Sequence, residues 1–76
     1  MGRRFFEYRG MKIPRSEILA IAEAFRETWP QLTSNQAITL AEHAIKLAID
    51  KALGYMASYE YHVKEVKILV DSWDNI

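Results

Sequence analysis

The chain has 76 residues, with ten basic and ten acidic side chains, two histidines and no cysteine. This length allows one small domain, and the missing cysteines exclude disulfides, cysteine-bound zinc and a thiol nucleophile. No apolar run is long enough to span a membrane, and residues 1–7 lack the apolar core of a secretory signal. We therefore expect a cytoplasmic protein with no membrane partner.

The zero net charge hides an uneven distribution of charged residues. Residues 1–15, which we call the basic head, carry five basic side chains and one acidic side chain. Residues 16–76 carry five basic and nine acidic side chains. A basic head on an acidic remainder favours binding of an anion at the N-terminal end.

Residues 5–13 are predicted to form a short β-hairpin, with an irregular arm as the alternative. Aromatic and β-branched residues flank the pair Arg9 and Gly10, and glycine supplies the positive φ that a tight turn needs. An isolated two-stranded hairpin is only marginally stable, so it would have to pack on helices.

A first helix is predicted over about 15–29. Pro14 suits its start, Ser16 is expected to cap it, and Glu17 favours the helix dipole. Pro30 disfavours helical geometry at the residue before it and so marks the end. An apolar stripe about 100° wide predicts a surface helix, and its members are Ile18, Ile21, Ala22, Phe25 and Trp29.

A second helix is predicted over about 34–55. Thr33 and Gln36 have the spacing of a capping box, and Leu32 and Ala37 that of a hydrophobic staple. Apolar residues fill about 200° of its circumference, twice the usual width, so this helix needs neighbours on more than one side. The remaining polar side is assigned Glu42, Lys46, Thr39, Asp50 and His43, with His43 expected to face solvent.

A C-terminal helix is predicted over about 57–73. Its valines favour a strand, but strand alternation would put charges on both faces, whereas a helix collects an apolar stripe about 120° wide. The stripe consists of Tyr59, His62, Val63, Val66, Leu69, Val70 and Trp73. It continues the phase of the second helix, so the chain forms either one helix of about 40 residues or two helices that bend near Gly54 or 57–58.

The overall expectation is a mainly α fold, a small helical bundle with a short N-terminal hairpin or arm, in one domain covering 1–76. A chain this short without disulfides often oligomerises, and the first helix is too short to cover the long apolar face. We predict a homo-oligomer interface at Ile38, Ile45, Ile49, Ala52, Tyr59, Val66 and Trp73. Ile45→Asp would then disrupt assembly and folding together.

The basic head is the first candidate site, because guanidinium groups pair with phosphate and aromatic rings stack on bases. The predicted anion ligands are Arg3, Arg4, Arg9, Lys12 and Arg15, with Phe5, Phe6 and Tyr8 as stacking surfaces. A nucleotide or a short nucleic acid would suit such a site. In the alternative, the aromatic residues cover the core while the arginines are solvated or pair with the acidic remainder.

Other candidates are weaker. His62 and Glu65 have the spacing of one half of a di-metal site, but His62 lies in the apolar stripe, so a core or interface histidine is the preferred interpretation. No serine has a nucleophile motif, and we expect no enzyme activity, no metal and no cofactor. Tyr61 and Ile68 lie together on the polar face, either as scattered surface residues or as a partner contact.

The sequence therefore predicts a non-enzymatic helical protein that self-associates and binds an anionic ligand through its head. Two alternatives remain: a protein-binding inhibitor or adaptor, and a purely structural assembly protein. The size, the missing cysteines and the mixed charge resemble the small proteins that phages encode to bind host components. That resemblance is one of style, and it carries over no motif and no residue.

Overall fold

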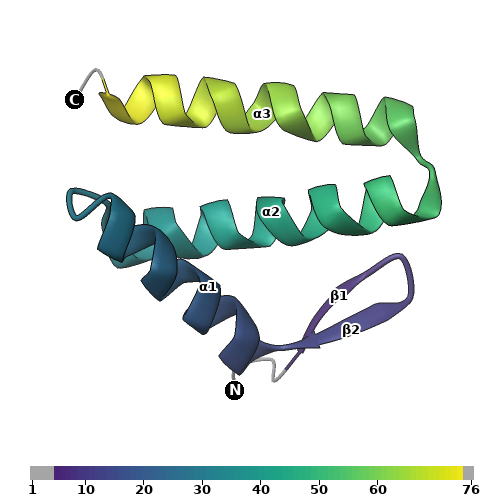
Figure 1. Cartoon of the computed structure of the whole chain (residues 1–76), viewed down its shortest axis with the longest axis horizontal. Coiled ribbons are helices and arrows are strands. Elements are labelled where there is room, and N and C mark those ends of the chain that lie inside the picture. The colour runs from purple at the N-terminus through teal and green to yellow at the C-terminus, as the bar shows by residue number, and fades with distance from the viewer. Residues whose placement is uncertain (1–4, 75–76) are drawn as a thin grey trace. The chain divides into compact units, whose positions relative to one another are not determined.

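The computed structural model describes residues 5–74 and confirms the mainly α fold (Figure 1). Two strands, β1 (Phe5–Tyr8) and β2 (Met11–Pro14), precede three helices, α1 (Arg15–Thr28), α2 (Ser34–Leu53) and α3 (Met56–Asp74). The chain divides into two compact units inside α2, the first ending at Glu42 and the second beginning at His43. None of the helices within 5–74 is long and apolar enough to cross a membrane.

The N-terminal hairpin is confirmed, and the irregular arm is wrong. The strands β1 and β2 pair antiparallel, with Phe6 opposite Ile13 and Tyr8 opposite Met11. Arg9 and Gly10 form the two-residue loop with φ of 51° and 80°, and positive φ at both positions is what a type I′ hairpin turn requires.

Helix α1 begins one residue earlier than its expected cap. Pro14 occupies the N-cap position and no side chain caps the helix, so the prediction for Ser16 is wrong: Ser16 already lies in the first turn. Ile18 and Ala22 are buried as the stripe predicted. Trp29 departs from the stripe, because it is the C-cap with φ −126° and its side chain is 45% exposed.

The start of α2 has the predicted capping box. The Thr33 N–H donates to Gln36 Oε1 at 2.9 Å, and the Gln36 N–H donates to Thr33 Oγ1 at 3.1 Å. Each side chain thus satisfies a backbone donor of the other residue. Leu32 and Ala37 are both buried, as the hydrophobic staple predicts.

Gly54 ends α2, so the bent alternative is confirmed and the continuous helix is not formed here. Its φ is +82°, its N–H donates to the Lys51 carbonyl at 3.3 Å, and the Tyr55 N–H donates to the Asp50 carbonyl at 2.8 Å. These two bonds and the left-handed glycine define a Schellman motif. The motif places the ends of the helices at Leu53 and Met56 rather than at 55 and 57.

The two units bury different residues. The first unit buries only apolar side chains among those described, and these are Ile18, Ala22, Leu32, Ala37, Leu40 and Ala41. The second unit buries Ile49 and Asp50. All seven members of the predicted α3 stripe are half-buried, which confirms the helical pattern.

Candidate functional site

The tip of the hairpin is an exposed part of the basic head. Arg9 is exposed, and its guanidinium carbon lies 5.3 Å from the centre of the Tyr8 ring, within cation–π range. Arg9 is also the one non-glycine residue of 5–74 with a positive φ. Arg3 and Arg4 lie outside the described residues.

The other two cations of the head that the structure describes, Lys12 and Arg15, have acidic neighbours. Lys12 stands directly opposite Glu7 in the hairpin register, a cross-strand pair of opposite charge. Arg15 Nη1 lies 3.5 Å from Glu42 Oε2, with both side chains partly exposed. The structure therefore places Arg9, Lys12 and Arg15 beside three different neighbours, which are Tyr8, Glu7 and Glu42.

The aromatic residues of the head divide between the two faces of the hairpin. Phe6 and Tyr8 share one face and are half-buried, together with Ile13. Phe5 lies on the opposite face and is 51% exposed. Phe5 is thus the most exposed of the three aromatic residues, while Phe6 and Tyr8 belong to the half-buried side of the hairpin.

Asp50 is the residue that the sequence analysis missed. It was assigned to a polar, outward side of α2, but it is fully buried. Its Oδ2 accepts a 2.7 Å hydrogen bond from Ser58 Oγ in α3 and lies 3.8 Å from His62 Nε2. The assignment is wrong because α3 turns back at Gly54 and covers this side of α2.

One histidine adjoins the buried carboxylate, and a second histidine lies against the first. His62 Nδ1 lies 3.3 Å from Glu65 Oε1, so His62 stands between two carboxylates. Its ring lies edge-on to the His43 ring, with centroids 6.2 Å apart. His43 is half-buried, and the expectation that it faces solvent is wrong. The interpretation of His62 as a core or interface histidine agrees with its 12% side-chain exposure.

We call Asp50, Ser58 and His62 the Asp50 cluster. Its chemistry is that of a contact between two helices. The Ser58 hydroxyl donates to Asp50, and in a nucleophilic serine that proton would instead point to the imidazole. Within 5–74, no three His, Asp or Glu side chains are grouped so as to hold a metal ion. The cluster satisfies a buried carboxylate.

The turn between α2 and α3 forms an exposed apolar segment. All residues from 51 to 57 are exposed, and positions 52–57 read Ala-Leu-Gly-Tyr-Met-Ala. Leu53, Tyr55 and Met56 are 52%, 49% and 51% exposed. We call residues 52–57 the apolar turn. The sequence already contains this run, and the Schellman geometry explains why it points outward.

Other predicted contact residues are also accessible. Tyr61 and Ile68 are 62% and 68% exposed, so both lie on the outer face of α3 as predicted. Of the proposed oligomer interface, Ile49 is buried and Ala52 is exposed, and the remaining five positions are half-buried.

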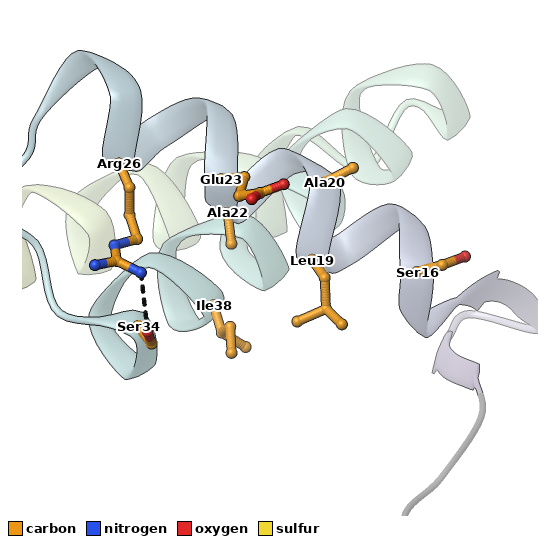
Figure 2. Close-up of a pocket in the computed structure, with 8 residues that line it drawn as sticks. All are labelled: Ser16, Leu19, Ala20, Ala22, Glu23, Arg26, Ser34 and Ile38. Carbon is orange, nitrogen blue, oxygen red and sulfur yellow. Dashed lines mark hydrogen bonds between the residues drawn. The ribbon is translucent and has the colours of Figure 1, made fainter.

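A shallow groove of about 450 Å³ runs along α1 in the first unit. Figure 2 shows Leu19 of α1 and Ile38 of α2 projecting toward the same open space. Arg26 closes one end by donating to Ser34 Oγ at 3.0 Å. The lining is mainly apolar, and its eight residues are Ser16, Leu19, Ala20, Ala22, Glu23, Arg26, Ser34 and Ile38.

The described residues thus offer four features: a strained arginine at a hairpin tip, a buried Asp50 cluster, an exposed apolar turn and a shallow groove. The first and third features are exposed surfaces, whereas the Asp50 cluster is internal. No protein-family model matches this chain, and no curated protein or solved structure matches it either.

Proposed function

We propose that the chain is a non-enzymatic binding protein that works as an assembly of its own copies, joined through α2 and α3. The apolar turn is the observation that carries this proposal. Five apolar residues and Gly54 are exposed there in one unbroken run, and soluble proteins leave such a run in water mainly where a partner covers it.

The burial of α3 supports the same proposal. None of its residues up to Trp73 is fully buried, although seven of them form a regular apolar stripe. A chain of 8.8 kDa without disulfides has little core of its own. Association of copies would remove part of the stripe and of the turn from water and so stabilise both.

The test compares two double variants by sedimentation velocity at micromolar concentration. We expect wild type to sediment with a mass at least twice 8.8 kDa, and Tyr55→Ser/Met56→Ser to shift it toward the monomer. Tyr61→Ser/Ile68→Ser is the matched control. It also removes two exposed apolar side chains, but from the outer face of α3 rather than from the apolar turn. A monomeric wild type contradicts the proposal and favours the inhibitor or adaptor instead.

An anion-binding head is the second candidate function, and the backbone of Arg9 favours it. A left-handed φ costs an ordinary side chain about 1 kcal/mol or more, and asparagine or glycine would form the same turn with less strain. Arg9 adopts this φ at 51°, although its guanidinium group also lies 5.3 Å from the Tyr8 ring. Strain retained at an exposed position points to a use for the guanidinium group.

Titration with nucleotides and short oligonucleotides at two salt concentrations tests this second function. We expect Arg9→Gln/Lys12→Gln to weaken binding about tenfold or more, with a smaller salt dependence. Lys64→Gln/Lys67→Gln is the control, because it removes the same charge from exposed positions of α3. Equal losses in both variants, or no binding by wild type, would count against a specific site.

A further inference from the structure

The contacts between α2 and α3 come from residues that are spaced four apart in the sequence. Asp50 in α2 meets Ser58 and His62 in α3, at 2.7 Å and 3.8 Å, and Gly54 lies midway between Asp50 and Ser58. Positions four apart form one ridge along an α-helix. In an unbroken helix, Asp50, Gly54, Ser58 and His62 would therefore form a single ridge with the glycine near its centre.

Two backbone hydrogen bonds close the turn at Gly54, and both have a counterpart in a continuous helix. The Gly54 N–H now donates to the Lys51 carbonyl, and the Tyr55 N–H donates to the Asp50 carbonyl. In a continuous helix each N–H bonds the carbonyl four residues earlier. The Gly54 N–H would then donate to the Asp50 carbonyl and the Tyr55 N–H to the Lys51 carbonyl, so the same two acceptors stay bonded. Gly54 is the turn residue whose φ must change sign, from +82°.

Opening the turn also changes the environment of the apolar turn. At about 100° per residue, the stripes of α2 and α3 lie on the same side of a continuous helix. Tyr55, which is 49% exposed in the hairpin, would enter that shared stripe one helical turn before Tyr59. The open form thus has one uninterrupted apolar face, and Tyr55 is part of it.

We propose that the α2–α3 hairpin opens at Gly54 into one continuous helix, and that two opened chains cross there antiparallel, with Asp50 of each chain meeting Ser58 and His62 of the other. This exchange rests on the self-association proposed above, and it specifies how two copies join. Ridges of residues four apart pack at about 50°, the commonest helix crossing. The exchanged dimer costs little, because it reuses the contacts of the closed hairpin.

Gly54→Ala is the first test. Alanine disfavours the left-handed turn and favours the helix, so the dissociation constant of the dimer is expected to fall by about 100-fold or more. Gly10→Ala is the matched control: Gly10 has φ +80°, and a Cβ at either glycine would meet nothing within 4 Å. Gly10→Ala is expected to strain the β-hairpin and to leave the dissociation constant unchanged.

An intrachain distance separates this exchange from ordinary self-association. The chain has no cysteine, so Lys46→Cys/Lys64→Cys can carry two spin labels, and excess unlabelled protein leaves only distances within one chain. The closed hairpin predicts a backbone separation of about 10 Å, and the continuous helix predicts about 27 Å. The measurement is made on wild type at rising concentration and on Gly54→Ala.

If the fraction of chains with the long distance rises with wild-type concentration, the exchange is supported. This result does not require Gly54→Ala to be stable enough to study. Dimers that keep only the short distance overturn the exchange and leave self-association intact. Protein that stays monomeric at every concentration overturns both.

Discussion

Each of the two units of the chain is stabilised internally, and the chemistry differs between them. The first unit, up to Glu42, buries a set of small and branched apolar side chains around Ile18, and its polar contacts lie at the surface. The second unit, from His43, buries Ile49 beside a carboxylate, and its central contact is the bond between Asp50 and Ser58.

This difference predicts which substitutions destabilise each unit. Apolar burial is non-directional and spreads over many residues, so a charge at its centre is costly and a lost surface contact is not. A buried carboxylate depends on a few donors, and its loss leaves them without their acceptor. The substitutions below test this contrast in order of decreasing change in stability.

Ile18→Asp should be the most damaging substitution. Ile18 is completely buried, and an unpaired charge at such a position costs roughly 4 kcal/mol or more, enough to unfold a small domain. Circular dichroism and urea denaturation would measure the loss. Leu19→Asp is the control, since the neighbouring side chain is 46% exposed and should lose less than about 1 kcal/mol. Similar losses for the two variants would contradict the assignment of the core.

Asp50→Ala should cost about 3 kcal/mol of unfolding free energy, because it removes the acceptor of Ser58 and the neighbour of His62. Val66→Ala, at a half-buried position of α3, should cost only about 1 kcal/mol. The reverse order would show that the second unit is held by its apolar stripe. A double-mutant cycle of Asp50→Ala with Ser58→Ala isolates the bond, and a coupling energy near zero would remove it from the argument.

Thr33→Ala should lower the unfolding free energy by about 1 kcal/mol, the usual value of an N-cap. It removes the acceptor for the Gln36 N–H at the start of α2. Asn35→Ala, two residues later at an exposed position, is expected to change stability much less. Equal effects would mean that helix propensity, rather than capping, governs this end of α2.

Arg9→Asn should stabilise the chain by about 0.5–1 kcal/mol. Asparagine tolerates the left-handed region better than arginine does, and Arg9 has φ 51° at the hairpin turn. The same variant should weaken any anion binding by the head, so stability and affinity move in opposite directions. A destabilised Arg9→Asn would show that the contact between Arg9 and Tyr8 outweighs the strain.

Arg15→Ala should have the smallest effect, at most about 0.5 kcal/mol, because an ion pair this exposed contributes little. The Arg15 and Glu42 side chains are 44% and 29% exposed. Thermal melts at low and high salt would check it, since any contribution should fall as salt rises. A loss above about 1 kcal/mol would make this contact part of the structural centre of the first unit.

Much of the fold was predictable because its signals are local in sequence. The capping box at Thr33, the turn at Gly10 and the stripe of α3 each need only a few neighbouring residues. The break at Gly54 was one of two alternatives, since the same glycine fits a bend or the polar side of a long helix. Backbone geometry decided between them.

The Asp50 cluster was not predictable from a single helix. A helical wheel assigns sides relative to the rest of the same helix, and it placed Asp50 outward. What buries Asp50 is the return of α3, which brings Ser58 to within 2.7 Å of it. Treating Gly54 as a helix end would have shown that Asp50 and Ser58 flank one turn, and that signal was available in the sequence.

Gly54 has a consequence for chemical synthesis. Because a Cβ there would meet nothing within 4 Å, the cost of L-alanine comes from handedness alone and not from lack of room. A D-residue prefers the positive φ that L-residues avoid, so D-alanine at position 54 should hold the chain reversal in place. A mirror-image pair of methyl groups at one atom would then select between two shapes of the same polypeptide.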